Sequence, residues 1–229
     1  MTIKFDLHGH TKYSCDSNIE PKEIAKRSIK NGVNVVAVTD HNTIKGGLAT
    51  KKYETKNFKV IVGSEISTIP TGGEVIGLFL TEEIKRGSLE EVIENIRAQN
   101  GIVIVPHPFD TGRESALHPS NKQAKLFDGI EGFNARCNVK EYDSISIEYG
   151  KKHNLTLVAG SDSHIKSEIG NAWNITECES VREAIEKNNL EFGGIRTPHI
   201  NRMFSRGIKK WRKTATVLHI PSSNTYIYD

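Results

Sequence analysis

Short apolar runs alternate along the chain with segments of helical periodicity. Seven runs rich in apolar and β-branched residues predict strands. These runs are residues 3–7, 33–38, 59–62, 74–80, 102–105, 129–133 and 156–159. Strands that alternate with helices, without a long linker, indicate one α/β domain with a largely parallel sheet. The pattern leaves a closed barrel and an open doubly wound sheet as alternatives.

Residues with strong positional preferences mark the ends of the predicted helices. Pro21 lies near the start of the first helix and Gly32 just past its end, which is the usual asymmetry of helix ends. The other helices are expected over residues 88–100, 119–126, 139–153 and 180–189. A Ser-x-x-Glu capping box opens the first and the last of these four.

The composition is that of a globular protein rather than a membrane protein. The chain has 229 residues, 36% of them hydrophobic, and no run approaches the roughly 18 apolar residues of a membrane span. Its N-terminus lacks an apolar signal core, so we expect a cytoplasmic protein. Cys15, Cys137 and Cys178 are odd in number and far apart, which excludes a disulfide framework and a CxxC motif.

The formal net charge of +3 is unevenly distributed. Residues 196–229 contain seven of the 31 Lys and Arg residues and one of the 28 acids, which leaves 24 bases and 27 acids in residues 1–195. This basic tail has two interpretations. It is either a helix that binds nucleic acid through phosphate contacts, or a terminal helix whose apolar stripe packs on the rest of the protein, and we favour the second. The stripe consists of Met203, Phe204, Ile208 and Trp211.

Polar clusters follow the C-terminal ends of the apolar strands. They are residues 6–10, 39–42, 63–65, 106–108, 134–136 and 160–164, and they hold five of the nine histidines. In a parallel barrel or sheet such strand ends converge on one face, where active sites are built. Each cluster alone has an ordinary explanation, such as a turn or a helix cap. Together, at six successive strand ends, they predict a metal site.

The residue types in these clusters narrow the kind of metal site. Imidazoles and carboxylates without a thiolate cluster fit Zn, Mn or Fe in a hydrolytic site better than a structural zinc site. The candidate ligands exceed what one ion needs. Two or three divalent ions are therefore expected.

Five motifs, in this order and at these spacings, resemble those of the polymerase and histidinol phosphatase (PHP) superfamily. They are DLHGHTKYSCDS, AVTDHN, GSE, PHP and GSDSH, and the resemblance covers residues 3 to about 175. It implies a single distorted (β/α)7 barrel, similar to a TIM barrel, with a trinuclear site at the C-terminal ends of the strands. It implies a catalytic barrel domain over 1–195, which leaves 196–229 as a basic tail packed on the barrel.

The resemblance also implies which residues hold each ion. One ion would be held by His8, His10, Glu65 and Asp162, a second by Glu65, His107 and Asn134, and a third by Asp16, His41 and His164. Asp40 would orient a ligand imidazole. Asn134 departs from the stronger ligands often found at its position in the family, so the second ion would bind more weakly.

The reaction expected of such a site is hydrolysis of a phosphate ester by a metal-bound hydroxide. Asp162 and His164 would act in catalysis, with His164 a candidate to protonate the leaving alkoxide. Arg136 and Arg113 would anchor phosphate oxygens, because a guanidinium fork matches their geometry.

The motifs look like those of the stand-alone PHP phosphoesterases. This resemblance implies activity on nucleotides, on nucleoside 3′,5′-bisphosphates, or as a 5′-3′ exonuclease on short oligonucleotides. No membrane and no obligate protein partner are expected. Three alternatives stay open: an activity like that of histidinol phosphatase, a non-catalytic nucleic-acid-binding protein, and an amidohydrolase, although the bridging Lys usual in amidohydrolases has no candidate at these strand ends.

Overall fold

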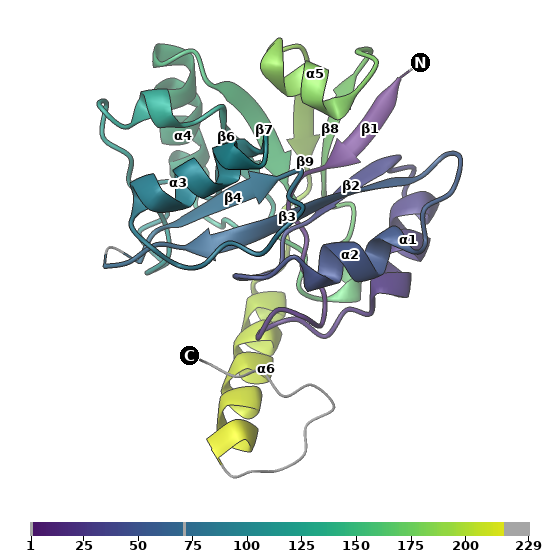
Figure 1. Cartoon of the computed structure of the whole chain (residues 1–229). Coiled ribbons are helices and arrows are strands. Elements are labelled where there is room, and N and C mark those ends of the chain that lie inside the picture. Colours follow the sequence, from purple (N-terminus) through teal and green to yellow (C-terminus); the bar gives the residue numbers. More distant parts are fainter. Residues whose placement is uncertain (1, 71, 218–229) are drawn as a thin grey trace.

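A nine-stranded sheet curls into a nearly closed, distorted barrel in the computed structural model, which describes residues 2–70 and 72–217 (Figure 1). Its strands are β1 (Ile3–Asp6), β2 (Val35–Val38), β3 (Lys59–Ser67), β4 (Glu74–Leu78), β5 (Ile102–Val105), β6 (Gly129–Asn134), β7 (Thr156–Gly160), β8 (Ala172–Thr176) and β9 (Glu191–Gly194). The helices are α1 (Pro21–Lys30), α2 (Lys45–Lys51), α3 (Leu89–Ala98), α4 (Lys140–Lys152), α5 (Val181–Glu186) and α6 (His199–Val217). The predicted distorted α/β barrel is confirmed.

The sheet contains two parallel blocks joined by antiparallel strands. β1, β2 and β3 are parallel to one another, as are β5, β6 and β7. Between the blocks, β4 pairs antiparallel with both β3 and β5. Beyond β1, the unpredicted strands β8 and β9 continue the sheet, also antiparallel. The sheet is therefore less uniformly parallel than the strand and helix pattern predicts.

The side chain of Asn174 helps to close the barrel between β8 and β7. Its Oδ1 accepts a hydrogen bond from Ala159 N (2.8 Å), and its Nδ2 donates to Ala159 O (2.9 Å) and to Phe5 O (3.2 Å). Just beyond the strands, Asp162 N donates to His8 O at 2.8 Å. These contacts bring the ends of the first and seventh strands together, although the two strands are far apart in the sequence.

Most helix predictions hold at the level of the element. Pro21 is the first residue of α1, and Gly32 follows the helix with φ +71°, a backbone conformation that glycine adopts readily. Ser88 and Glu91 form the predicted capping box of α3. The helix predicted over 119–126 is only a 3-10 turn at Ala124–Leu126.

Helix α2, in a stretch that reads as merely polar, was not predicted. It packs so closely that a Cβ on Gly46 would lie 1.7 Å from Asp40 Oδ2. Only glycine fits at that position with this backbone.

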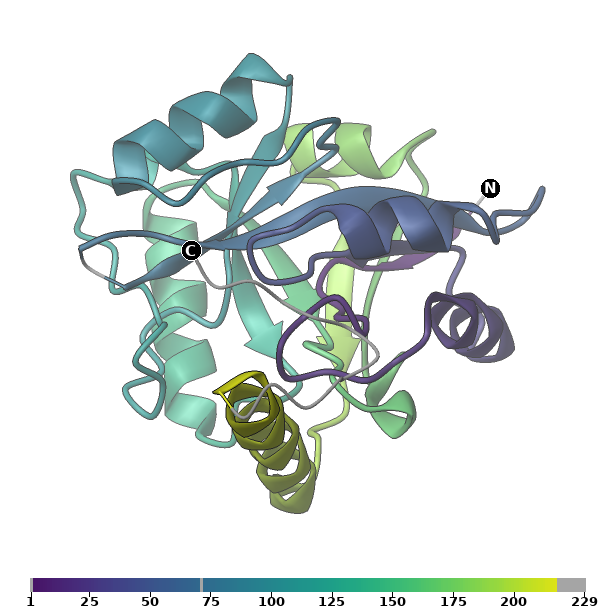
Figure 2. The ribbon, with the colours of Figure 1, turned by 60° about the horizontal axis from the view of Figure 1, so that its bottom comes forward.

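The two ends of the barrel differ in character. At one end, Val181 and Ile185 of α5 belong to a hydrophobic cluster that includes Phe5, Ile104 and Val158 of the strands. Helix α6 lies at the opposite end in Figure 1, and Figure 2 views the molecule from that side. Apolar packing therefore fills the barrel at α5 and leaves the α6 end for polar residues.

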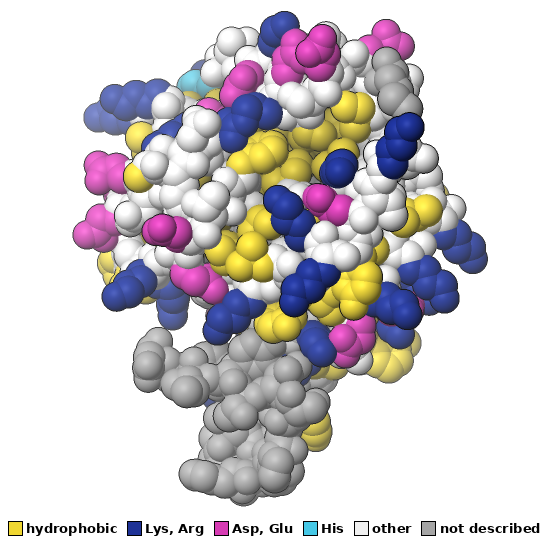
Figure 3. Space-filling view, turned by 45° about the vertical axis from the view of Figure 1, so that its right-hand side comes forward, with side chains coloured by type: hydrophobic (Ala, Val, Ile, Leu, Met, Phe, Trp, Pro, Cys, Tyr) yellow, Lys and Arg dark blue, Asp and Glu magenta, His cyan; other side chains and the backbone are white. Residues whose placement is uncertain are grey.

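The surface mixes charges of both signs. Figure 3 shows Lys and Arg side chains with acidic side chains between them and hydrophobic side chains near the centre of that face. In the described part of the chain, no helix combines the length and the apolar character that crossing a membrane requires.

Helix α6 contacts the barrel through its polar face rather than through the apolar stripe. Met203, Phe204 and Trp211 are 69%, 61% and 61% exposed, whereas Ser205 is buried. The expectation that this stripe packs on the barrel is therefore wrong. The polar face packs against the barrel because the barrel end opposite it carries buried charged groups that need polar partners.

Candidate metal centre

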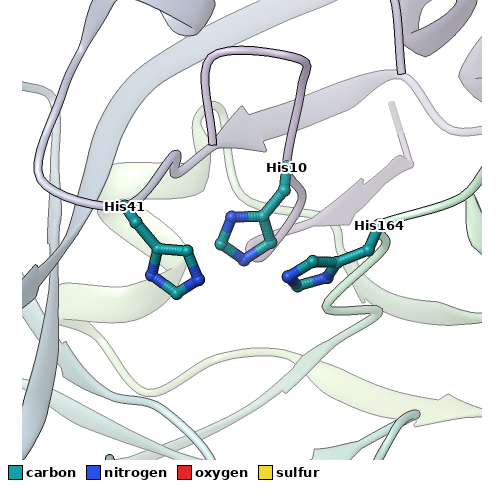
Figure 4. A group of neighbouring side chains, drawn as sticks. All are labelled: His10, His41 and His164. Atoms are coloured by element: carbon teal, nitrogen blue, oxygen red, sulfur yellow. The ribbon is translucent and has the colours of Figure 1, made fainter. Parts of the chain in front are cut away.

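Five histidines converge at the barrel end that faces α6. His8 and His10 follow β1, and His41, His107 and His164 follow β2, β5 and β7. All are buried except His41, which is partly exposed. The ring centroid of His10 lies 4.7 Å from that of His41 and 4.1 Å from that of His164, and the three rings face a common space (Figure 4). The structure thus brings together every histidine that the sequence placed at a strand end.

Glu65 lies at the centre of this histidine group. Its Oε2 is 3.1 Å from His41 Nδ1, 3.4 Å from His10 Nε2 and 3.5 Å from His8 Nε2. Its Oε1 is 2.8 Å from His107 Nε2. One carboxylate therefore reaches four imidazoles, the position that a group bridging two ions requires.

Two aspartates complete the ring of predicted acids. Asp162 Oδ1 lies 3.2 Å from His164 Nδ1 and 3.5 Å from His10 Nε2. Asp16 reaches His164 Nε2 at 3.2 Å and His41 Nε2 at 3.4 Å. Asp162 has φ +51°, a conformation that costs a non-glycine residue about 1 kcal/mol or more and that clusters at functional sites.

Glu74 is a candidate ligand that the sequence reading missed. Its carboxylate lies 3.4 Å from His41 Nδ1 and 3.9 Å from His107 Nε2. The polar clusters that predicted the site follow the ends of the predicted strands, but Glu74 is the first residue of β4. Because β4 runs antiparallel to its neighbours, its first residue lies at the same edge as their last residues.

Among the described residues, three groups of ligand atoms are close enough to hold cations. In each group the ligand atoms lie within 4.8 Å of one another, and the groups are His10, His41 and His164; His8, His10 and Asp162; and His41, Glu65 and Glu74. They overlap in His10 and His41. Adjacent ions that share ligands are the arrangement expected for a centre with more than one metal.

The tautomers of His8 and His10 test whether this site suits a cation. His8 Nδ1 lies 2.8 Å from a Glu131 oxygen, so it carries a proton. His10 Nδ1 lies 2.9 Å from Ser14 Oγ, which donates its own proton to Asp40 Oδ1, so this nitrogen is protonated too. The two Nε2 atoms face each other at 3.1 Å. If both rings are neutral, the lone pairs of the two Nε2 atoms point at each other and repel. A cation bound there would remove this repulsion, so these residues fit a metal ion.

Charge within the cluster shifts the pKa values strongly. Burial alone would lower the pKa of His8, but the surrounding carboxylates, Glu131 first, raise it well above the usual 6.5. Burial would raise the pKa of Glu65, but His8 and His41 lower it well below 4.5. Burial and the neighbouring imidazoles lower the pKa of His10 to about 3. Without metal, protons on imidazoles therefore balance the carboxylates, and a metal ion would displace them.

Glu131 is a second residue that the sequence reading missed. It is buried in β6 and accepts hydrogen bonds from His8 Nδ1 (2.8 Å), from the backbone N of His107 (2.6 Å) and from Asn134 Nδ2 (2.8 Å). A lone acid inside the apolar run GIEGFN is the only signal in the sequence. Its carboxylate fixes the orientation of a ligand imidazole, as partners of metal-binding histidines do.

Asn134 lies at the site, with its amide already engaged. Its Oδ1 accepts hydrogen bonds from Arg136 N at 3.0 Å and from Arg113 Nη2 at 3.2 Å. Asp40 accepts from Ser14 Oγ, which in turn contacts His10 Nδ1. The ligand role of Asn134 therefore stays a prediction, and Asp40 acts on an imidazole through a serine hydroxyl.

Both predicted arginines reach the metal centre. Arg113 Nη1 lies 2.7 Å from Asp162 Oδ2, and its Nε lies 3.0 Å from Asp110 Oδ2. Arg136 Nη1 lies 4.0 Å from Asp162 Oδ1, and its Nη2 donates to Ser205 Oγ of α6 at 2.5 Å. Two guanidinium groups thus lie beside the same candidate ligand.

A cavity of about 390 Å³ opens above these residues. Candidate ligands form its floor, together with Arg113 and Arg136. Arg202, Ser205, Arg206 and Lys209 of α6 form part of its wall. The site is therefore a basic, walled pocket over a cluster of imidazoles and carboxylates.

Comparison with known proteins agrees with this geometry. The model of the family described as PHP domain matches residues 6–195. The chain belongs to the PHP family. An uncharacterised protein of Methanocaldococcus jannaschii is 48% identical to this PHP protein over 145 residues, which cover 58% of the chain and 82% of the relative.

Two further proteins that are similar to this chain carry functional descriptions. A 5′-3′ exoribonuclease of Haemophilus influenzae is 42% identical over 72 residues, which cover 30% of this chain and 25% of that enzyme. A two-domain protein of Bacteroides vulgatus, described as containing a predicted PHP-like metal-dependent phosphoesterase, shares the fold with a TM-score of 0.71 and 19% identity. That alignment covers 85% of this chain and 65% of the other.

Proposed function

We propose that this PHP protein is a metal-dependent phosphoesterase that acts on nucleotides, on nucleoside 3′,5′-bisphosphates or on the 5′ ends of short oligonucleotides. The observation that carries the proposal is the convergence of five histidines and several carboxylates beneath a pocket that also holds two arginines. The names of two relatives, a phosphoesterase and an exoribonuclease, support the same reaction class.

The residues that would hold divalent ions are the clustered imidazoles and acids. These are His8, His10, Asp16, His41, Glu65, Glu74, His107, Asp162 and His164. Zn, Mn or Fe at such a site would stabilise charge on phosphoryl oxygens and provide a nucleophile at neutral pH. His107 Nδ1 is buried and has no hydrogen-bond partner within residues 2–70 and 72–217, so this nitrogen is also free to act as a ligand.

The arginines would orient the phosphate. Arg113 is held by Asp110 and Asp162, and their charges keep its pKa above the usual value although burial opposes this. Arg136 is fixed by Ser205. Two immobilised guanidinium forks can bind a phosphate's non-bridging oxygens with little loss of conformational freedom.

His164 is the candidate proton donor to the leaving alkoxide. Its Nδ1 lies 2.8 Å from Asp162 O, and its Nε2 lies 3.2 Å from Asp16 Oδ1. Asp16 and the hydrogen bonds around the ring raise the pKa of His164, whereas burial and Arg136 oppose this shift. In the metal-free fold this raised pKa keeps a proton on His164 at neutral pH. As the general acid, His164 would leave the third ion to Asp16 and His41, because an imidazole that holds a metal ion has lost that proton.

A hydrolysis screen, which measures free phosphate and, for the RNAs, released mononucleotides, tests the proposal. Wild-type protein is loaded with Mn, Zn or Fe and offered nucleotides, nucleoside bisphosphates, 5′-phosphorylated short RNAs, p-nitrophenyl phosphate and a carboxyl ester. We expect release from phosphate esters but not carboxyl ester cleavage, and loss of release in His8→Ala and Asp162→Ala. Lys210→Ala, on the exposed part of α6, serves as the control. Equal release by wild type and both site variants would contradict the proposal, as would cleavage of the carboxyl ester alone.

A further inference from the structure

Helix α6 adds a set of positive charges to the pocket. Arg202, Ser205, Arg206 and Lys209 are spaced i, i+3, i+4 and i+7, so they lie on one face of the helix. All four line the cavity. Helix α6 starts after residue 195, where the match to the PHP family ends. These charges therefore lie outside the part of the chain that the family model matches.

Contacts around Ser205 fix the position of this helix face relative to the metal centre. Ser205 is buried and accepts a hydrogen bond from Arg136, whose Nη1 is 4.0 Å from the candidate ligand Asp162. Arg212, two turns further along α6, donates to the backbone oxygen of Ser14, in the segment that also carries Asp16. The helix is thus tied to the site at two points and holds its cations over the opening.

Among the described residues, the cations on this face have no acidic partner within ion-pair distance. Within the described residues, neither Arg202, Arg206 nor Lys209 forms an ion pair, whereas Arg113 has two. Burial and the nearby guanidiniums of Arg113 and Arg136 lower the pKa of Arg202. Apart from the candidate metal ligands, Glu114 is the only acid among the described residues that line the cavity. Positive charge at the mouth is therefore in excess.

We propose that Arg202, Arg206 and Lys209 form a subsite for a second phosphate group, one that is not hydrolysed. The inference rests on the proposed function, because it assumes that the reacting phosphate lies at the metal centre between Arg113 and Arg136. Those two arginines would bind the reacting phosphate. The cations of α6 line the same cavity, and Arg206 and Lys209 are exposed to solvent. There they would bind the next phosphate of a nucleoside 3′,5′-bisphosphate or of a 5′-phosphorylated oligonucleotide.

Substrates with one and with two phosphates test the subsite. The kcat/KM of wild type and of Arg206→Ala/Lys209→Ala is measured for adenosine 3′,5′-bisphosphate, AMP and a 5′-phosphorylated dinucleotide. Loss of charged hydrogen bonds to phosphate should lower the preference for two phosphates over AMP by about tenfold to a hundredfold. Lys210→Ala, which removes an exposed charge of α6 outside the cavity, should leave this preference at the wild-type value.

The substrates distinguish the two sources of the second phosphate. A loss confined to adenosine 3′,5′-bisphosphate indicates a small bisphosphate, and a loss confined to the dinucleotide indicates an oligonucleotide. An unchanged preference in the double variant, or an equal loss with AMP, would overturn the subsite.

Binding separates failure of the subsite from failure of the proposed function. Calorimetry with chelator-treated wild type should show tighter binding of adenosine 3′,5′-bisphosphate than of AMP, and the double variant should lose this difference. If the wild type hydrolyses no ester but shows the difference, the proposed function fails and the subsite stands. If the wild type hydrolyses esters without the difference in binding or preference, the subsite fails and the proposed function stands.

Discussion

Replacing Glu131 by glutamine changes one atom of a buried group and should still disable the metal centre. The carboxylate accepts three hydrogen bonds, one oxygen from His8 Nδ1 and the other from His107 N and Asn134 Nδ2. Glutamine has only one acceptor oxygen. If its NH₂ group faces His8, Nδ1 of that ring must become an acceptor, so the ring proton moves to Nε2. Nε2 is the nitrogen that faces the other histidines, and once protonated it cannot bind a metal ion.

The opposite rotamer is no better. Its NH₂ group then meets two donors, the His107 amide and the Asn134 side chain, and both lose their acceptor. A buried donor without a partner costs about 1–3 kcal/mol. Loss of a hydrogen bond that orients a ligand histidine lowers metal affinity by about tenfold to a hundredfold. We therefore expect Glu131→Gln to lower the metal affinity if it takes the first rotamer and the free energy of unfolding if it takes the second.

Isothermal titration of chelator-treated protein with Mn²⁺ measures the affinity, and urea unfolding measures the stability. Glu114→Gln is the matched control, because Glu114 lines the same cavity but is exposed. Circular dichroism checks that both variants fold. Wild-type affinity and wild-type unfolding free energy in Glu131→Gln would refute the role assigned to this carboxylate.

Three further predictions address packing, positioning and pH. Gly46→Ala forces a Cβ to within 1.7 Å of Asp40 Oδ2 and should lower the free energy of unfolding in urea by about 1–3 kcal/mol. Gly207→Ala is the control, because a Cβ there would have nothing within 4 Å, and it should not lower this free energy. Equal unfolding free energies in the two variants would contradict the packing. Ser205→Ala removes the acceptor that holds Arg136 and should lower kcat/KM for phosphate release by about tenfold, measured at a temperature where the variant is fully folded. An unchanged kcat/KM would contradict the positioning role. Carboxylates raise the pKa values of His8 and His41 above the usual 6.5 in the metal-free fold. Their protonation therefore stabilises that fold fully below pH 6.5, and the contribution is lost as the pH rises through the raised values. The melting temperature of the chelator-treated protein should fall above pH 6.5 and recover when Mn²⁺ is added. A melting temperature that rises above pH 6.5 in the presence of chelator would contradict the charge balance.

The sequence predicted the residues of the site better than the layout of the strands. Strand ends such as those before His8 and His164 were found because apolar runs stop abruptly at polar motifs. Strands β8 and β9 were missed because the first is broken by polar residues and the second is the glycine-rich stretch Glu191–Gly194. β8 takes its place in the sheet by pairing with β1, and β9 by pairing with β8. The pairing with β1 is a tertiary contact that a local pattern does not contain.

The residues missed at the site have similar physical causes. Glu74 starts a strand instead of ending one, so it is recognised only once β4 is known to be antiparallel. Glu131 lies inside a strand and acts through His8. The apolar stripe of α6, which includes Trp211, has the pattern of a helix face that is usually buried. In the described part of the chain it is exposed. In each case the outcome depends on what the rest of the fold places opposite the residue.

The rate of phosphate release against added Mn²⁺ measures whether hydrolysis needs more than one metal ion. Chelator-treated wild type is titrated with Mn²⁺ on the ester that the screen ranks first, beside Asp162→Ala. We expect no release without metal, a rate that still rises beyond one equivalent of Mn²⁺ per chain, and no release by the variant at any Mn²⁺ concentration. Full activity without metal, a plateau at one equivalent, or equal titrations for both proteins would contradict a phosphoesterase with more than one metal ion.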